Sequence, residues 1–270
     1  MRNSKRLLAL VLALCLALPA PAWATITNGG GAGIANSTSA GTTLVVTPDD
    51  SFAVGNYAIL MIGFDNTGTT DADHNEIASI TGTQTNTWTK LCEFTNGQTA
   101  ADAGVTVSTY MSRITSPITS GVDTITVTFA NTIARKVLLV RKFTVNGGSF
   151  LIKVGTCQTE APDGTADPGS LAVTGLTSEE HLCFRATAQE NDETTNQTVT
   201  SNYTIINDAQ ADGGADADSI RLDGELRIHT ADNCTSDPTT THTDTDGVSV
   251  LVALKELPGG GSSRLMGVGR

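Results

Sequence analysis

Aromatic and charged side chains are both scarce in this sequence of 270 residues, at 4% and 16% of the chain. Histidine is rarer still, with only His74, His181, His229 and His242. The chain also lacks the G-x-S-x-G, H-E-x-x-H, P-loop and dinucleotide-binding motifs that carry many catalytic and nucleotide sites. We therefore predict that the protein is not an enzyme and has no catalytic residue.

Basic residues are few as well: 16 Lys and Arg stand against 28 Asp and Glu, for a formal net charge of −12. An acidic surface of this kind repels phosphate backbones, so nucleic acid is excluded as a partner. The same surface suits calcium or a basic protein partner, and charge alone does not choose between them.

The N-terminus has the three parts of a secretory signal peptide. The basic residues Arg2, Lys5 and Arg6 precede an apolar run over 7–18 and the small-residue pattern at 22–24. The apolar run is shorter than the roughly 20 residues that a membrane-spanning helix needs. We predict that residues 1–24 are cleaved, which takes the net charge from −12 to −15. The mature chain then has no membrane span; a retained N-terminal anchor is the alternative.

Cysteine usage agrees with export. Cys15 lies in the predicted signal, which leaves Cys92, Cys157, Cys183 and Cys234 as disulfide candidates. Four cysteines in an exported chain predict two disulfides, with all three pairings open, and buried free thiols are the alternative. No two of these cysteines have C-x-x-C spacing and no histidine pattern accompanies them, so the spacing predicts no zinc site.

Period-2 alternation runs through the chain and predicts β-strands with one apolar face. In the segment 124–129, Ile125, Val127 and Phe129 alternate with threonines. In the segment 219–229, Ile220, Leu222, Leu226 and Ile228 share an apolar face. We expect the opposite, polar face to lie in water and to form cross-strand ion pairs. That polar face consists of Arg221, Asp223, Glu225, Arg227 and His229.

Two segments, 58–64 and 137–140, are apolar throughout and predict strands covered on both faces. Turn-forming Gly, Pro, Asn and Asp residues separate the strands, and no helical period is found. We predict an all-β, antiparallel, jelly-roll-like β-sandwich of about a dozen strands. The first residues after the signal carry no strand pattern.

The two halves of the chain follow a similar order of strands, so they are candidates for a pseudo-duplication. One interpretation is a single sandwich over 25–257, a jelly roll whose halves interleave as Greek keys. The alternative is two tandem sandwiches, 40–146 and 150–257. The segment 258–270 begins with Pro-Gly-Gly-Gly-Ser-Ser and predicts a flexible tail, or else a short peptide that docks on a neighbouring subunit.

An acidic segment offers the best candidate for a metal site. Asp71, Asp73 and Asn75 have the one-three-five spacing that places oxygens around calcium. Glu76 stands where an EF-hand has glycine, and no carboxylate occupies the twelfth position, so a solvated acidic turn is the alternative. A second acidic loop contains Asp208, Asp212, Asp216 and Asp218. No cofactor other than a structural calcium ion is expected.

Trp88 is the candidate for ligand binding, because sugar-binding modules use aromatic platforms. The mature chain has only this tryptophan, with Tyr57, Tyr110 and Tyr203 as its tyrosines. A place in the core is the alternative for Trp88, and the shortage of aromatic residues weakens the carbohydrate-binding hypothesis.

Four segments resemble a loosely defined group of β-sandwich proteins found among bacteriophage virion or tail-associated proteins and bacterial surface proteins. They are an early Leu-Val-Val strand at 44–46, an Asn-Thr-Trp-Thr hairpin at 86–89, a Thr-rich strand at 124–129 and a closing apolar strand at 248–256. Thr85 departs from the glycine common in that hairpin, and the cysteines lie outside the pattern. The resemblance implies a structural or attachment role without catalytic residues.

Together these observations predict an exported structural or interaction protein of a cell surface, an extracellular appendage or a virion. A signal peptide favours the bacterial surface or extracellular space over a virion. The expected partner is a protein or a cell surface, and a homo-oligomer is also open. The alternative function is a carbohydrate-binding or adhesin-like module, with or without calcium.

Overall fold

A computed structural model describes residues 25–101, 103–145, 150–161, 169–177, 179–190, 197–215, 219–230, 233–239 and 246–257. These residues contain fifteen strands, and every ladder between them is antiparallel. The predicted all-β antiparallel fold is thereby confirmed, with more strands than the dozen expected. Within these ranges no helix is long and apolar enough to cross a bilayer. The predicted signal 1–24 and tail 258–270 fall outside the described residues.

The first eight strands form two sheets. The larger has the order β1-β8-β3-β6-β5 and the smaller the order β2-β7-β4. The larger sheet consists of β1 (Ile26–Ser37), β8 (Lys136–Val145), β3 (Tyr57–Asp65), β6 (Val105–Arg113) and β5 (Thr89–Thr95). The smaller sheet consists of β2 (Gly41–Val46), β7 (Ile125–Ile133) and β4 (Ile77–Gly82).

The last seven strands repeat this arrangement. The larger sheet has the order β12-β13-β11-β15-β9, and a two-stranded sheet pairs β10 with β14. The larger sheet consists of β12 (Thr204–Ala211), β13 (Ile220–Thr230), β11 (Glu180–Glu190), β15 (Gly247–Leu257) and β9 (Phe150–Glu160). The smaller consists of β10 (Leu171–Val173) and β14 (Cys234–Ser236). An isolated bridge between Thr198 and Thr239 follows at the position that β4 occupies in the first half.

The order of strands therefore differs from the interleaved jelly roll that was one expectation from sequence. Each described sheet contains strands from one half only. The last strand of each half closes its large sheet: β8 lies between β1 and β3, and β15 lies between β9 and β11. The chain alternates between its large and small sheets in the same sequence in both halves. The first half also begins at Ile26 and not at residue 40.

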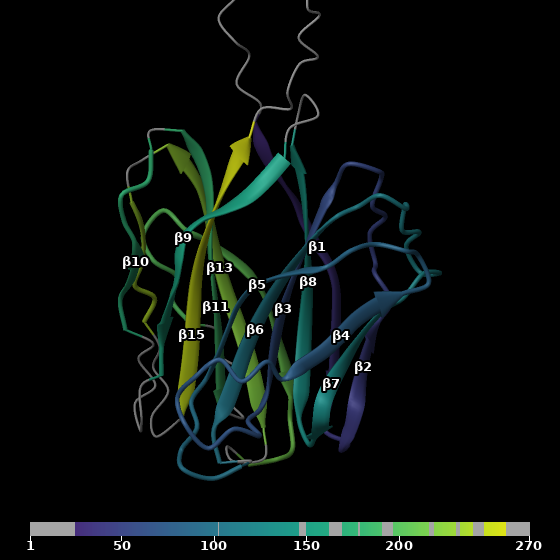
Figure 1. The fold of residues 1–270 in the computed structure, drawn as a ribbon, viewed down its shortest axis with the longest axis vertical. Coiled ribbons are helices and arrows are strands. Elements are labelled where there is room, and N and C mark those ends of the chain that lie inside the picture. Colours follow the sequence, from purple (N-terminus) through teal and green to yellow (C-terminus); the bar gives the residue numbers. More distant parts are fainter. Residues whose placement is uncertain are drawn as a thin grey trace, which may run out of the picture.

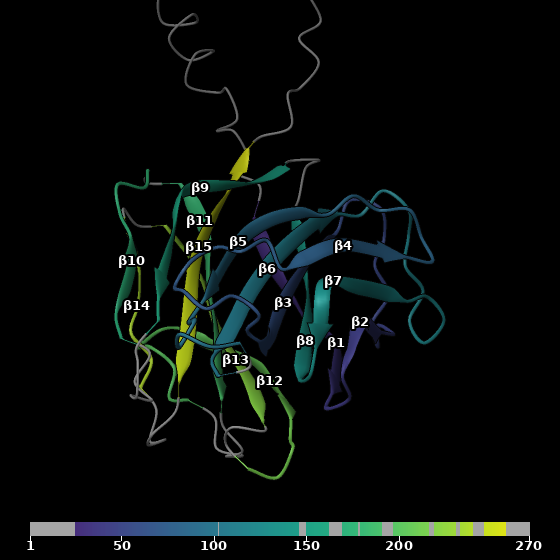
Figure 2. The same cartoon turned by 60° about the horizontal axis from the view of Figure 1, so that its bottom comes forward.

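The four sheets are stacked, with the two large sheets in the middle and a small sheet outside each (Figures 1 and 2). The main apolar cluster fills the space between the large sheets and contains residues from both halves, such as Met61 and Phe184. A second cluster lies under β2-β7-β4 and a third under β10-β14. The two halves thus share a core.

The apolar segments 58–64 and 137–140 form the central strands β3 and β8, where both faces are covered, as predicted. Ile59 and Met61 enter the shared core, and Leu60 and Ile62 enter the cluster under the small sheet. Gly63 lies where the large sheets approach closely, since a Cβ there would be 3.1 Å from the Cβ of Ala188. A side chain at position 63 would therefore crowd Ala188 of the other half.

Strand β1 was not predicted, because its Gly-rich sequence has low strand propensity. Its ladder with β8 is interrupted between Asn28 and Gly30 and again between Gly31 and Gly33. Gly30 and Gly33 have φ values of 102° and 152°, which glycine adopts without strain. The glycines therefore serve the two irregularities of an edge strand.

Candidate functional site

A depression of about 420 Å³ lies at the seam between the halves. It is formed by β5 and β9, the edge strands of the two large sheets, with one strand from each half. The residues that line it are Asp73, Lys90, Leu91, Cys92, Glu93, Phe94, Lys153, Cys157 and Thr159. Because β5 and β9 are far apart in sequence, no local pattern indicated this site.

The walls of the depression are joined covalently by the disulfide between Cys92 and Cys157, whose Cα atoms are 5.9 Å apart. Lys153 on β9 adds a hydrogen bond from Nζ to the Leu91 carbonyl oxygen on β5. The second disulfide joins Cys183 and Cys234 within the second half. The structure thus selects one of the three pairings that the sequence left open.

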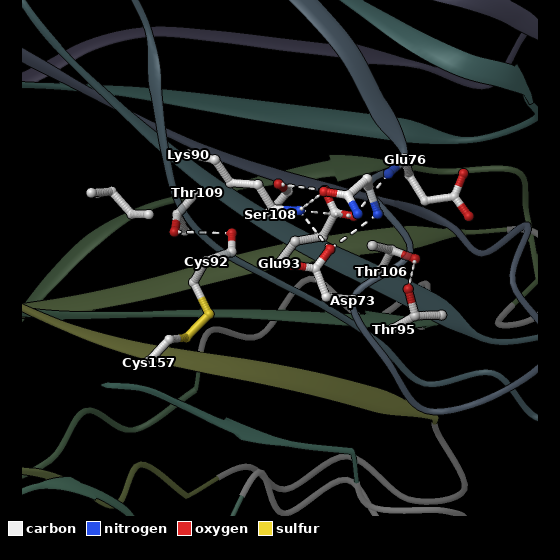
Figure 3. A network of polar contacts seen from close by, with 12 residues as sticks. Asp73, Glu76, Lys90, Cys92, Glu93, Thr95, Thr106, Ser108, Thr109 and Cys157 are labelled. Atoms are coloured by element: carbon white, nitrogen blue, oxygen red, sulfur yellow. Dashed lines mark hydrogen bonds and ion pairs between the residues drawn. A yellow bond between two sulfur atoms is a disulfide. The ribbon is translucent and has the colours of Figure 1, made fainter. Parts of the chain in front are cut away.

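Glu93 is the buried acid of the seam (Figure 3). Its Oε1 accepts a hydrogen bond of 2.8 Å from the Glu76 backbone N–H, and Oε2 accepts one of 3.0 Å from Ser108 Oγ. Burial raises the pKa of Glu93, against the opposing effects of the Glu76 N–H and of Lys90, whose Nζ is 3.5 Å from Oε1. Glu93 is therefore held in place by hydrogen bonds within the fold.

The predicted calcium loop lies beside this acid, and an ammonium group occupies its centre. Lys90 Nζ bonds Asp73 Oδ1 and, at 3.0 Å, Asn75 Oδ1. Burial alone would raise the pKa of Asp73, but hydrogen bonds from Lys90 and the Asn75 N–H outweigh it and hold that pKa below its usual value. Asp71 turns elsewhere and accepts a bond from the Gly97 N–H at 3.0 Å. Two of the three predicted ligands therefore converge, on a lysine.

The position of Lys90 leads to a prediction about calcium. Because its ammonium already neutralises Asp73, we expect millimolar calcium to leave the Tm of the unaltered protein unchanged. Lys90→Ala frees the oxygens of Asp73 and Asn75 and is expected to make the Tm rise with calcium. Thermal unfolding with calcium and with a chelator checks this, and a calcium-dependent Tm in the unaltered protein would contradict it.

Chemically, the seam offers both charged and apolar groups. Lys90, Lys153 and the partly exposed Asp73 supply charges of both signs, and Phe94 and the disulfide supply apolar surface. The lining also includes the hydroxyl of Thr159 and the carboxyl groups of Asp73 and Glu93. The depression therefore has the size and the polar groups to hold a small polar ligand.

The largest difference from the sequence prediction concerns the polar face of β13. The alternation was right, since Ile220, Leu222 and Leu226 enter the shared core. The opposite face is buried over its first three polar residues: Arg221, Asp223 and Glu225 are 1%, 0% and 0% exposed, whereas Arg227 and His229 are half-buried. Residues of neighbouring segments contact it, since Asp208 pairs with Arg221, and Thr200 and Ser236 bond Glu225. A polar strand face has the same sequence pattern whether it is solvated or covered.

The charges on this covered face are paired inside the fold. Arg221 Nε lies 2.9 Å from Asp223 Oδ2, and Arg221 Nη2 lies 3.1 Å from Asp208 Oδ2. Glu225 accepts hydrogen bonds from the Thr200 N–H at 2.6 Å and the Thr200 hydroxyl at 2.7 Å. These pairs offset much of the cost of removing the charges from water.

In the second acidic loop, Asp208 is thus an ion-pair partner, and Asp212 accepts a bond of 2.7 Å from the Gly214 N–H. Asp216 and Asp218 lie outside the described residues.

Trp88 lies in the connection between β4 and β5 and packs, half-buried, against the cluster under the small sheet. Tyr57, Tyr110 and Tyr203 are all buried, so none of them extends an aromatic surface from Trp88. The role of Trp88 in ligand binding stays a prediction.

Asp123 braces the loops near Trp88. Its carboxylate accepts hydrogen bonds from Gln84 Nε2 at 2.9 Å, the Thr119 N–H at 2.7 Å and the Thr83 hydroxyl at 2.7 Å. These bonds lower the pKa of Asp123 to about 2.

A carboxyl group whose pKa is lower in the folded than in the unfolded protein stabilises the fold at a pH above the unfolded-state pKa. That contribution is lost as the pH falls through the folded-state pKa. We expect Asp123→Asn to lower the Tm at pH 7, and the difference to shrink between the ordinary pKa of 3.8 and pH 2. Thermal scans of both proteins across this range check it; a Tm difference independent of pH would contradict it.

Comparison with protein-family models, with curated proteins and with solved structures finds no match to this chain. The site is therefore interpreted from its own geometry.

Proposed function

We propose that this chain is an exported, non-enzymatic β-sandwich protein that serves as an interaction module of a cell surface, an extracellular appendage or a virion. The observation that carries the proposal is the internal pairing of its buried charged groups, Glu93 with the Glu76 N–H and Ser108, and Arg221 with Asp223. The Arg221–Asp223 pair is buried and stabilises the scaffold, whereas a catalytic site presents reactive groups to a cleft. Two disulfides and a shared core suit a rigid module outside the cytoplasm.

The outer face of β2-β7-β4 supports an interaction role. None of the residues in these three strands is charged, although the chain as a whole is strongly acidic. On the central strand, Thr126 lies between Val45 and Thr81, and Thr128 lies between Thr43 and Ser79. Val45 is 49% exposed. An uncharged face of methyl and hydroxyl groups is suited to packing against a protein partner.

This face provides the test. Val45→Glu combined with Thr81→Glu places one carboxylate on each side of Thr126. We expect binding of the purified protein to cells or particles of the source to fall about tenfold or more, because an unpaired charge buried in an interface costs well over the ~1.4 kcal/mol that this change requires.

Val54→Glu is the matched control, because Val54 is 63% exposed and lies outside the three strands. It is expected to leave binding unchanged, and both variants should keep the Tm of the unaltered protein. Equal binding by the double variant and the control would refute this face as the interface.

A carbohydrate-binding role is the second candidate, and the depression at the seam favours it. A volume of about 420 Å³ with Lys90, Lys153 and Asp73 among its lining residues suits a small polar ligand such as a sugar unit. Lys153→Ala should then weaken glycan binding in a glycan screen, whereas the double variant of the small sheet should not.

A further inference from the structure

The disulfide between Cys183 and Cys234 has a histidine beside it. His229 Nε2 lies 2.9 Å from Cys183 Sγ and 3.6 Å from Cys234 Sγ. The two sulfurs and one ring nitrogen of His229 all lie within 4.8 Å of one another. These are the atoms that bind soft and borderline transition metals, and they converge on one point.

His181 is a second histidine on the same face. It pairs directly with His229 in the ladder between β11 and β13, and Cys183 follows two residues later on the same side of β11. His181 is 0% exposed, yet neither of its ring nitrogens makes a hydrogen bond of good geometry to any described residue. The nearby backbone of Glu179 favours the charged ring but forms no such bond. Buried polar atoms without partners are rare and indicate that something is missing at the site.

We propose that Cys183, Cys234 and His229, with His181 as the fourth ligand, form a site for one divalent ion of the zinc class when the disulfide is reduced. The oxidised chain holds the disulfide in its place. The inference does not depend on the proposed interaction role.

The exchange balances. A dithiol gives two electrons and two protons to the disulfide, which yields the thiols of Cys183 and Cys234 and oxidises the dithiol to a disulfide. The metal ion then displaces two protons and binds both thiolates. A disulfide oxidant reverses the process: it takes two electrons from the thiolates, forms the cystine bond and releases the ion.

Three of the four ligands already lie close together, and His181, which is outside the group whose ligand atoms lie within 4.8 Å of one another, would have to turn toward them. In a tetrahedral site with metal–sulfur and metal–nitrogen distances of about 2.3 and 2.0 Å, ligand atoms are separated by roughly 3.5 Å. The separations of His229 Nε2 from the two sulfurs are already 2.9 and 3.6 Å. His181, Cys183 and His229 stand on two strands of a five-stranded sheet, whereas Cys234 stands on the three-residue strand β14.

The metal would also keep the link that the disulfide makes. Cys183 belongs to the large sheet and Cys234 to β14, whose ladder in the described residues is with β10 alone. Either state of the site therefore fastens β14, and β10 with it, to β11 of the large sheet.

The test is metal binding by the full chain in two redox states. Protein reduced with a trialkylphosphine, which takes its oxygen from water, is freed of reductant and titrated with Co²⁺ as a spectroscopic substitute for zinc. We expect one Co²⁺ per chain with thiolate charge-transfer and tetrahedral visible bands, displaced by Zn²⁺, and none in the oxidised chain. Absence of stoichiometric binding by the reduced chain, or the same binding by the oxidised one, would overturn the proposal.

Variants assign the ligands. In a chain with Cys15→Ala, Cys92→Ala and Cys157→Ala, Cys183 and Cys234 are the only thiols. In that background His229→Ala should weaken binding about tenfold or more, and His181→Ala should change the visible bands. His74→Ala is the control, since His74 bonds the Thr70 carbonyl oxygen in the loop before β4. The site would be refuted if His229→Ala bound Co²⁺ as tightly as the His74→Ala control and circular dichroism showed that it keeps the β fold.

Discussion

Replacement of Arg221 with methionine is expected to lower the free energy of unfolding by about 3–5 kcal/mol. Arg221 and Asp223 are almost fully buried and lie 2.9 Å apart, so the change removes the guanidinium that offsets the buried charge of Asp223. Denaturant unfolding at pH 7 measures the effect.

Removing both charges should restore most of the loss. Arg221→Met with Asp223→Leu replaces the pair by apolar groups, which is often close to neutral for buried pairs. Lys255→Met is the surface control: it breaks an ion pair of 3.0 Å with Glu179, whose side chain is 39% exposed, and should cost at most about 1 kcal/mol. If Arg221→Met lowers the free energy of unfolding no more than this control does, Asp223 does not depend on Arg221 to offset its buried charge.

Loss of the disulfide across the seam should have the next largest effect. Cys92→Ala with Cys157→Ala opens a link over a sequence separation of 65 residues, and we expect a loss of about 2–4 kcal/mol. The link constrains the unfolded chain, and in the folded state it ties β5 of the first half to β9 of the second. Denaturant unfolding of the oxidised variant and the oxidised unaltered chain gives the difference.

The same variant tests how the halves depend on each other. Because the large sheets still share their apolar core, we expect the fluorescence of Trp88 in the first half and the circular dichroism of the whole to change together. Transitions that separate would show that the disulfide, and not the core, couples the halves.

The strand faces followed directly from alternation in the sequence. Ile125, Val127 and Phe129 all enter the cluster under the small sheet, as their spacing predicted. The doubly covered strand β3 was equally clear, because only burial on both faces accommodates a run such as 57–65. Local pattern therefore identified which side chains are buried against a sheet neighbour.

Contacts between distant elements were not predictable in this way. The polar side of β13 has the alternation of a solvated strand, and its burial depends on residues of other segments, such as Asp208, Thr200 and Ser236. At the seam β5 lies beside β9, although the two strands belong to different sheets. In the cysteine–histidine cluster, His229 of β13 lies beside Cys183 of β11. Cysteine spacing predicted no zinc site because Cys183, His229 and Cys234 are brought together by the fold and not by their positions in the sequence.

The two halves share one order of strands and differ in what lies beneath their small sheets. Under β2-β7-β4, strand β3 of the large sheet contributes Leu60 and Ile62. Under β10-β14, the corresponding strand β11 contributes Arg185 and Thr187. One half therefore has an ordinary apolar core, and the other encloses paired charges and the cysteine–histidine cluster. The cysteine–histidine cluster therefore belongs to the second half, and the uncharged strands β2, β7 and β4 belong to the first.

The most direct test of an exported interaction module is the location and state of the natural protein in a culture of its source. Fractionation followed by intact-mass analysis without reductant is expected to find a chain lacking residues 1–24, with Cys92–Cys157 and Cys183–Cys234 linked, in the surface or particle fraction. A full-length chain with free thiols inside the cells would contradict the account.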